Sequence, residues 1–491
     1  MQDFFSLSAS DLRRQLASRA ASPREVLSAF RSRIEQLNPH LNAFVEMCWD
    51  RAEREAVAAE AVQMRGGDLP PLFGLPVAVK ESTNVEGLHT TLGSRLFADR
   101  IATEDAPTVA AIRAAGGIII GKTNVPELLQ GGTSQNTLYG LTRNAYDPSL
   151  SCLGSSGGSA VALSASMVPL ATGSDMGGSI RGPSAGNGTA GLRPSPGLVA
   201  YPSLPLAFDV SSVVGPMARS TEDVMLLLAG MICSSPFDPF DWNPDISPLL
   251  TPVPLEARKL RVAVSPDLGC IQVDGGIRGR FEEVIAAITP EVSRIEWVTP
   301  DLGPINHAFY MLRTLAYLVA YGEVHASAPE RLTAAKNVDL RRGFAASARM
   351  IAEAQRVQTQ AFRALAGFMQ GFDVLITPGA SEPLPSLEEV NRREAALKAD
   401  NARFAPDEYD FDRMPKPSIN TPITWTAHPV ATITAGLGHD GLPFGINLIG
   451  RYRDDIRLLR IALALEQVLN GLEEFGRPVP DLSRYLAERR A

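Results

Sequence analysis

Serine and glycine are concentrated in one stretch of the chain, residues 151 to 193, and serine can act there as a nucleophile. GSSGG spans 154–158 and GSDMGGSIRG spans 173–182, with a short helix and a strand expected between them. One such cluster alone is typical of a flexible linker. Two clusters around ordered apolar structure indicate loops at which the backbone approaches something closely, so a site is expected here.

The first cluster fits the G-x-S-x-G pattern of a nucleophile elbow, with Ser156 as the nucleophile. That motif requires a strand immediately before it and a histidine downstream. The preceding residues SLSCL are a weak strand candidate, and His428 is available as the partner. A serine–histidine hydrolase is therefore one alternative.

A second arrangement needs no histidine, because a neutral lysine can activate a serine when burial lowers the lysine pKa from about 10.4 toward neutrality. Lys80 ends the apolar run GLPVAVK, so an apolar environment for its side chain is expected. From position alone, however, a lysine at the end of a strand is more often a solvated charge.

Residues 116–123, GGIIIGKT, match the phosphate-loop pattern G-x-x-x-x-G-K-[ST]. A phosphate loop follows a strand and precedes a helix, whereas here the helical stretch TVAAIRAA (108–115) comes before the two glycines. The three isoleucines at 118–120 are β-branched and suit the interior of a strand. The stretch is therefore predicted to be helix, glycine turn and strand, which argues against a nucleotide-triphosphatase.

The elements around these segments alternate between helices and short apolar strands, which predicts an α/β fold with a mixed β-sheet core covered by helices on both faces. A helix is expected to begin at Ser22-Pro23 and to end at Asn38-Pro39. The strand candidates are 77–80, 118–120, 168–171, 260–264, 374–377, 430–434 and 444–449.

The chain is expected to form one large domain over residues 1–491, because neither an internal repeat nor a low-complexity linker divides it. Residues 1–65 form an N-terminal helical segment, 66–230 hold the site, and 231–491 complete the core. The polar, charged segment 394–417 is predicted to be a surface excursion.

Composition narrows the class of protein. With 20% charged residues, 45% hydrophobic residues and a formal net charge of −8, the chain is ordinary for a globular protein and a poor candidate for binding nucleic acid or an anionic membrane. Its four cysteines form no C-x-x-C pair, so no zinc site or disulfide framework is indicated. No secretory signal or long apolar run is evident, which predicts a soluble, cytoplasmic protein.

Several segments together resemble the amidase signature family. GLPVAVKE (74–81), GSSGGSA (154–160) and GSDMGGSIRGPSAGNGTAGLRPS (173–195) carry the resemblance. Further family-like segments follow in the family's order, so that the resemblance extends from about residue 25 to 470. The GGIIIGKT stretch belongs to this framework.

The resemblance implies a Ser–cis-Ser–Lys triad, with Ser179 as the nucleophile, Ser155 as the second serine and Lys80 as the general base. Lys80 would accept a proton from Ser179 through Ser155 and return it to the leaving amine, after which water hydrolyses the acyl-enzyme. Backbone N–H groups of Met176, Gly177, Gly178 and Ser179 would form the oxyanion hole.

The resemblance also implies that Asp175 and Arg181 brace the signature loop, and that Leu129 and Gly131 line the acyl pocket. No metal or organic cofactor is implied, since the triad and the oxyanion hole complete the chemistry. The expected partner is a small-molecule amide, which could be aliphatic, aryl, cyclic or carbamoyl, and a homodimer is one expectation for the oligomeric state.

Two functions within the family remain open at this point. One is a free-standing amidase, and the other is the glutaminase-type subunit of a glutamine-dependent tRNA amidotransferase. That subunit usually carries an RR-x-x-x-G-x-[FY] stretch, whereas the corresponding residues 340–355 read LRRGFAASARMIAEAQ, with the arginines but not the pattern that follows them. This difference favours the free enzyme.

Overall fold

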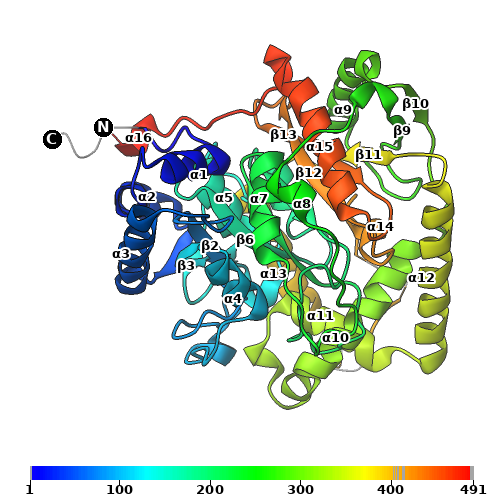
Figure 1. The fold of residues 1–491 in the computed structure, drawn as a ribbon. Coiled ribbons are helices and arrows are strands. Elements are labelled where there is room, and N and C mark those ends of the chain that lie inside the picture. The colour runs from blue at the N-terminus through cyan, green and yellow to red at the C-terminus, as the bar shows by residue number, and fades with distance from the viewer. Residues whose placement is uncertain (1–2, 402, 404, 406–407, 412–414, 487–491) are drawn as a thin grey trace.

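The computed structural model describes residues 3–401, 403, 405, 408–411 and 415–486. A mixed 11-stranded sheet crosses the molecule in the order β1-β3-β2-β6-β8-β7-β12-β13-β11-β9-β10 (Figure 1). Its strands are β1 (Phe44–Met47), β2 (Pro76–Lys80), β3 (Ile118–Thr123), β6 (Leu170–Asp175), β7 (Ala190–Arg193), β8 (Val213–Ala218), β9 (Arg261–Val264), β10 (Arg294–Trp297), β11 (Val374–Pro378), β12 (Val430–Leu437) and β13 (Pro443–Ile449). The short strands β4 (Gln135–Asn136) and β5 (Gly140–Leu141) pair separately.

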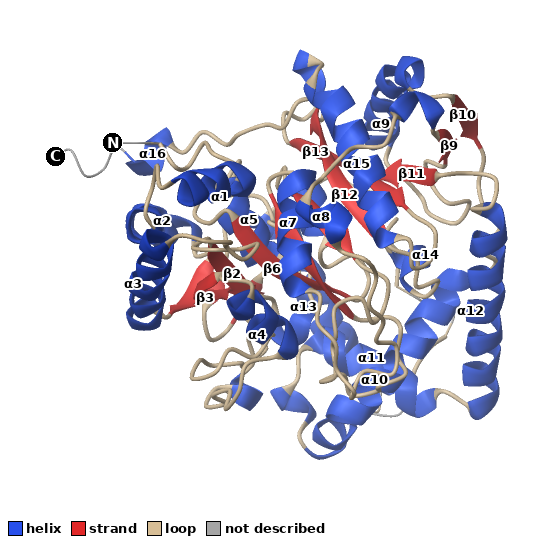
Figure 2. Ribbon diagram, in the orientation of Figure 1, coloured by secondary structure: helices blue, strands red, loops and turns tan. Residues whose placement is uncertain are grey.

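Helices cover both faces of this sheet, as the sequence predicts (Figure 2). They are α1 (Ala9–Ser18), α2 (Pro23–Leu41), α3 (Trp49–Arg65), α4 (Pro107–Ala114), α5 (Gly157–Ser164), α6 (Arg181–Gly186), α7 (Thr221–Met231), α8 (Ser247–Leu250), α9 (Gly275–Ile288), α10 (Ile305–Ser327), α11 (Ala334–Ala345), α12 (Ala348–Phe368), α13 (Leu387–Asn401), α14 (Thr421–Thr424), α15 (Asp455–Asn470) and α16 (Ser483–Leu486).

The part of the sheet that carries the serine clusters is parallel. β2 pairs in parallel with β3 on one side and with β6 on the other. The helix α4 connects β2 to β3, and α5 lies between β3 and β6, as expected for crossovers between parallel strands. β8 runs antiparallel to both β6 and β7, and β12 runs antiparallel to both β7 and β13, so the sheet as a whole is mixed.

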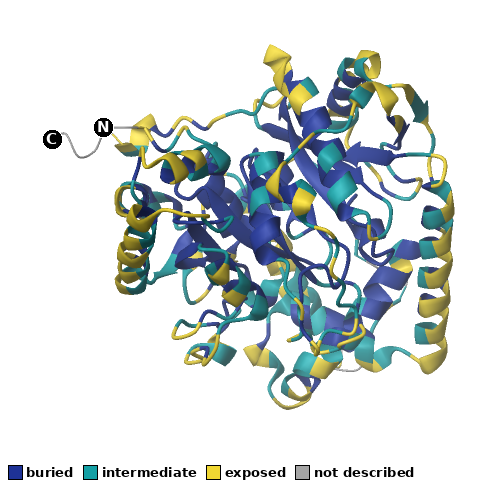
Figure 3. Ribbon diagram, in the orientation of Figure 1, coloured by how far each residue is buried: buried dark blue, intermediate teal, exposed yellow. Residues whose placement is uncertain are grey.

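Alternation along the strands divides the apolar core between the two faces of the sheet. Val77 and Val79 of β2 belong to one buried cluster together with side chains of α4, α7 and α15. Ala78 belongs to a second cluster together with side chains of α5. Figure 3 shows the strands buried between these layers, with exposed residues on the outer sides of α3 and α12.

The stretch GGIIIGKT has the order expected of framework structure. α4 ends at Ala114, Gly116 turns the chain at φ +84°, and β3 follows. The lysine of the motif, Lys122, is fully buried. It donates to the backbone carbonyls of Thr83 at 2.8 Å and His89 at 2.9 Å, so it anchors the loop after β2 rather than a phosphate.

Several boundaries differ by a few residues from those predicted, for instance at the end of α2 and at β6. The helix α2 begins at Pro23 as expected, but it continues through Pro39 to Leu41, because a proline near the end of a helix removes only one hydrogen bond. The strand predicted at 168–171 runs from Leu170 to Asp175, so that the first residues of the second glycine–serine cluster belong to β6.

In the segment 394–417, residues 394–401 belong to the largely exposed helix α13. Residues 402, 404, 406–407 and 412–414 of that segment lie outside the described residues. Among the helices that the structure describes, none combines the length and apolar character that a membrane crossing requires.

Candidate active site

Lys80 is the last residue of β2 and lies at the face of the sheet that α5 covers. Side chains alternate along a strand, so Lys80 shares the side of Ala78 rather than that of Val79. The residue is fully buried. Its backbone N–H donates to the Thr172 hydroxyl on the neighbouring strand β6 at 3.0 Å, which fixes the start of the side chain.

Three serine hydroxyls surround the Lys80 amine. The Nζ atom lies 2.7 Å from Ser155 Oγ, 2.9 Å from Ser156 Oγ and 2.8 Å from Ser174 Oγ. Within the described part of the chain, no carboxylate forms an ion pair with this amine. The lysine therefore lies in a neutral, hydroxyl-rich environment.

Burial lowers the pKa of Lys80 from 10.5 to about 7, and the charges of Asp175 and Glu81 only partly offset this effect. The Glu81 carboxylate is turned to another partner and accepts a hydrogen bond from the Thr91 hydroxyl at 2.7 Å. The neutral amine is thus readily populated near neutral pH. Such an amine can accept a proton from an adjacent hydroxyl.

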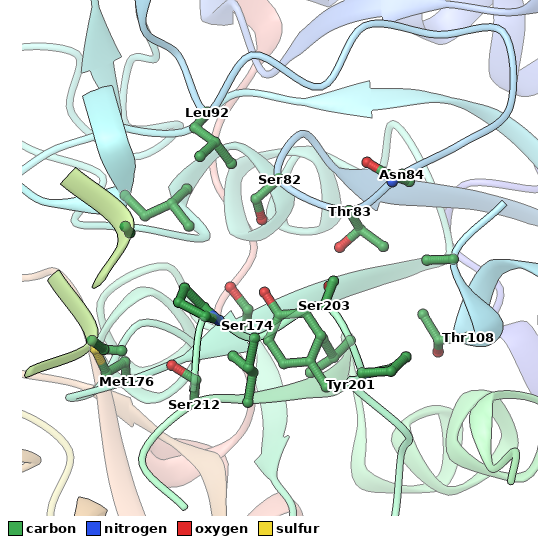
Figure 4. A pocket seen from close by; sticks show the side chains of 18 of the residues that line it. Ser82, Thr83, Asn84, Leu92, Thr108, Ser174, Met176, Tyr201, Ser203 and Ser212 are labelled. Carbon is green, nitrogen blue, oxygen red and sulfur yellow. The ribbon is translucent and has the colours of Figure 1, made fainter. Parts of the chain in front are cut away.

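Ser155 and Ser179 line one cavity of about 740 Å³. Ser155 is in the loop before α5, after a cis peptide bond from Gly154, and Ser179 is in the turn between β6 and α6. The Ser156 N–H donates to the Ser179 carbonyl at 3.1 Å, which ties the two loops together. In Figure 4, Ser82 lies on one side of this cavity and Ser174 on the other.

The hydroxyls of Ser155 and Ser179 are not hydrogen-bonded to each other, although both residues lie in the described part of the chain. The structure therefore brings Lys80 and Ser155 into contact and places Ser179 on the same cavity without completing the chain. Hydrogen bonds between catalytic groups are often long in free enzymes and tighten when substrate binds.

The Asp175 carboxylate faces the turn that carries Ser179. Its carboxylate accepts hydrogen bonds from the N–H groups of Gly177 at 3.1 Å, Gly178 at 2.9 Å and Ile180 at 3.0 Å. The Arg181 guanidinium donates to both carboxylate oxygens, at 2.8 and 3.0 Å. Burial alone would raise the pKa of Asp175, but the facing arginines hold it well below its usual range.

The backbone donors expected for an oxyanion hole fall into two groups. Gly177 and Gly178 donate to Asp175, so their N–H groups are already bonded. Met176 and Ser179 line the cavity, and their N–H groups have no acceptor among the described residues. The turn itself requires glycine, because Gly178 has φ +115° and a Cβ there would lie 2.6 Å from Asn420 Cβ.

Arg193, which the sequence analysis did not single out, ties the signature loop to two distant segments. It is fully buried. It donates to the backbone carbonyls of Asp175 at 2.8 Å, Ser211 at 2.9 Å and Thr424 at 3.0 Å. Ser174 was also missed, although it lies inside the glycine–serine cluster. For Arg193 the sequence carries no comparable signal, because these three carbonyl partners lie 18 to 231 positions away along the chain.

The nucleophile-elbow arrangement is not assembled. Ser156 is fully buried at the start of α5, and a loop rather than a strand precedes it. His428 Nδ1 lies 2.8 Å from the Thr426 carbonyl, and its ring packs against Phe362 and Tyr452. Burial lowers the pKa of His428 to about 4. His428 Nε2 has no hydrogen-bond partner in the described part of the chain, so it does not contact Ser156.

Of the two residues expected at the acyl pocket, one lines the cavity and the other does not. Leu129 lines the cavity, in a backbone conformation with φ +60°. Gly131 is not among the cavity residues, and its φ is +157°. Within the described residues, no group of three or more histidine, cysteine, aspartate or glutamate side chains is arranged to hold a metal ion.

The amidase family profile matches residues 25–459 of the chain. An acylamidase from Rhodococcus erythropolis is 32% identical over 491 aligned residues, covering 95% of this chain and 96% of the relative. A subunit of the glutamyl-tRNA(Gln) amidotransferase of Thermus thermophilus is also 32% identical, covering 94% of this chain and 96% of the relative. The names of similar proteins thus divide between amidases and this amidotransferase subunit.

A solved structure of a bacterial aryl acylamidase, described as an amidase signature enzyme, superposes with a TM-score of 0.82. It is 25% identical, and the match covers 94% of this chain and 96% of that one. The fold is therefore that of the amidase signature enzymes. With the family profile spanning most of its length, the chain belongs to the amidase family and is an amidohydrolase.

Proposed function

We propose that the chain is a free-standing amidase that hydrolyses carboxylic amides through an acyl-enzyme on Ser179. The observation that carries this proposal is the fully buried Lys80 amine, which lies 2.7 Å from Ser155 Oγ. Ser155 lines the same cavity as Ser179. The lowered pKa of Lys80, about 7, makes its neutral form available as the base.

In the proposed reaction, Ser179 Oγ attacks the amide carbonyl while its proton passes to Ser155 Oγ. Ser155 in turn gives its own proton to Lys80 Nζ. The return of the proton through the same chain converts the leaving nitrogen into an amine, and the carbon–nitrogen bond breaks. Water then repeats the attack on the acyl-enzyme and releases the carboxylic acid.

The negative oxygen of the tetrahedral intermediate needs donors that are free when it forms. The N–H groups of Met176 and Ser179 meet this requirement, whereas those of Gly177 and Gly178 are bonded to Asp175. We therefore assign the oxyanion contact to Met176 and Ser179, and the bracing of the turn to Asp175 together with Arg181.

The proposal is tested by labelling the protein with a fluorophosphonate and mapping the modified peptide by mass spectrometry. We expect the adduct on Ser179, no adduct in Ser179→Ala, and much slower labelling in Lys80→Met. Ser156→Ala is the matched control and should keep the site of labelling. An adduct on Ser156 in the wild-type protein would contradict the serine–lysine assignment.

The second candidate is the glutaminase-type subunit of a glutamine-dependent tRNA amidotransferase, which the similarity to amidotransferase subunits supports. The contacts of the paired arginines favour the free enzyme. Arg342 of the paired arginines donates to the Tyr409 hydroxyl at 2.7 Å and is held by the buried Asp339. Arg341 donates to the Asn401 carbonyl at 3.0 Å. Both arginines thus have internal partners rather than an open carboxylate-binding position.

Purification of the chain alone, followed by assays on amides and on glutamine, separates the two functions. A free-standing amidase hydrolyses amides without added proteins. Weak activity alone, combined with glutaminase activity that rises when partner subunits co-purify, would identify the amidotransferase component instead.

A further inference from the structure

Three tyrosines share the cavity that contains Ser155 and Ser179. Tyr317 and Tyr321 are one turn apart on α10, so they lie on the same face of the helix, with ring centroids 6.5 Å apart. Tyr201 comes from the loop after β7. Figure 4 shows Tyr201 on the same side of the cavity as Ser174, opposite Ser82 and Leu92. We call Tyr201, Tyr317 and Tyr321 the tyrosine wall.

The hydroxyls of the tyrosine wall have no hydrogen-bond partner among the described residues. Buried tyrosine hydroxyls are normally bonded, and others in this chain are. Tyr146 Oη donates to the Pro478 carbonyl at 3.0 Å, and Tyr310 Oη donates to the Lys416 carbonyl at 3.3 Å. The three residues of the wall are half-buried and line the cavity, so their unbonded hydroxyls are open to it.

The rings of Tyr317 and Tyr321 are held in place without help from their hydroxyls. Lys336 Nζ is fully buried and lies 3.3 Å from the centroid of the Tyr317 ring and 5.2 Å from that of Tyr321. The Arg313 guanidinium carbon lies 5.6 Å from the Tyr317 centroid. The Arg313 cation attracts the face of the Tyr317 ring. Burial lowers the pKa of Lys336 to about 7, so near neutral pH its amine is partly neutral and holds the rings mainly by packing against them. The hydroxyls are thus left available to a molecule in the cavity.

The charge on the same cavity limits the kind of group that can bind beside these hydroxyls. Asp209 is 8% exposed and lines the cavity. Its carboxylate accepts hydrogen bonds from the N–H and the hydroxyl of Ser211, at 2.7 and 2.9 Å, but it forms no ion pair within the described residues. The cavity is also lined by the cation Arg100, but its carboxylates, those of Glu104, Asp105, Asp175 and Asp209, outnumber that cation. An anionic ligand is therefore disfavoured, and a neutral substituent fits better.

We infer that the tyrosine wall selects amides that carry an aromatic ring with a neutral hydrogen-bonding substituent, such as a phenol. This inference rests on the proposed amidase function and names its substrate class. A cavity of about 740 Å³ is larger than a small aliphatic amide needs. Tyrosine rings offer apolar faces to an aromatic group, and their free hydroxyls can donate to or accept from its substituent.

The test compares amides that differ only by a hydroxyl in place of a methyl group of similar size. One pair, para-hydroxyphenylacetamide and para-methylphenylacetamide, places the ring on the acyl side. The other pair, para-hydroxyacetanilide and para-methylacetanilide, places it on the amine side. We expect kcat/KM to favour the hydroxyl compound by about tenfold in at least one pair, the effect of one hydrogen bond.

Tyr201→Phe, Tyr317→Phe and Tyr321→Phe each remove one oxygen and no hydrogen bond to any residue that the structure describes. At least one of them should abolish the preference for the hydroxyl compound while leaving the Tm unchanged. Tyr146→Phe is the matched control, since it loses the bond to the Pro478 carbonyl. It should lower the Tm and leave the substrate preference unchanged.

Binding of the same amides to Ser179→Ala separates the inference from the proposed function. If Ser179→Ala binds the hydroxyl compound more tightly, and a wall variant in this background reduces that preference, the tyrosine wall is supported. This holds even if the wild-type protein hydrolyses none of these amides. Such a lack of turnover would count against the amidase assignment instead. Equal binding and equal hydrolysis within both pairs, or a preference that no wall variant changes, would overturn the inference.

Discussion

Replacement of Lys80 by methionine provides a test of the neutral lysine that needs no substrate. Methionine has a similar length and no charge, so it can occupy the same buried position. The pKa of Lys80 is about 7 in the folded protein, against 10.5 for an unperturbed lysine. At about 1.4 kcal/mol for each pKa unit, a protonated Lys80 destabilises the folded state by about 5 kcal/mol.

The sign of the pH dependence follows from proton uptake. Between about pH 7 and pH 10.5, the unfolded chain holds a proton on this lysine that the folded protein has lost, so wild-type stability rises with pH there. Below this window both states are protonated and the full cost is present. Lys80→Met removes the titration, so its stability relative to wild type is greatest at low pH.

The hydrogen bonds that Lys80→Met loses lower its free energy of unfolding by an amount that does not depend on pH. Lys80 contacts the hydroxyls of Ser155, Ser156 and Ser174, and each bond is worth about 1 kcal/mol. We therefore expect Lys80→Met to be about 2 kcal/mol more stable than wild type near pH 6. Its advantage should fall by about 3 kcal/mol on going to about pH 9, which makes it the less stable protein there.

The assay is urea unfolding of both proteins at several pH values, followed by fluorescence or circular dichroism. Lys122→Met is the comparison, because burial lowers the pKa of Lys122 only to about 8. Its stability difference from wild type should change about half as much over the same range. A difference for Lys80→Met that is independent of pH, or that grows with pH, would refute the reasoning and leave the proposed relay without a base.

Three further predictions concern the site. Because Lys80 must be neutral to act as the base, kcat/KM should rise with pH through an apparent pKa of about 7 and then level off; a fall over that range would contradict the assignment. Gly178→Ala should lower the free energy of unfolding by about 2 kcal/mol or more and remove most of the activity, since its Cβ would lie 2.6 Å from Asn420 Cβ. Gly67 is the control, with φ +104° and no atom within 4 Å of an added Cβ. Gly67→Ala should cost less stability and keep the activity, as unfolding and rate measurements can check. Asp175→Asn should destabilise the protein by about 3–5 kcal/mol in urea unfolding, because two buried arginines lose their counter-charge, and a cost below about 1 kcal/mol would exclude a bracing role.

Much of the sheet could be predicted because apolar runs report burial on both faces of a strand. The runs at 77–80, 118–120, 374–377, 430–434 and 444–449 all fall within observed strands. The strand β8 was not predicted, since Gly215 and Pro216 argue against a central strand. Pro216 is accommodated because β7 pairs with β8 only at Met217 and Ala218, so Pro216 is outside that ladder and need not donate a hydrogen bond to β7.

The sequence by itself determined the family, and it identified the serines and the lysine whose roles are proposed here. Residue type and spacing carry this information, since the glycine–serine clusters and the strand-ending Lys80 are local patterns. Tertiary structure alone decided which groups touch. Arg193 joins Asp175 to Thr424, which lies 231 positions after Arg193, and the tyrosine wall combines α10 with the loop after β7. Such contacts depend on how distant elements pack, and local patterns of hydrophobicity contain no record of those distances.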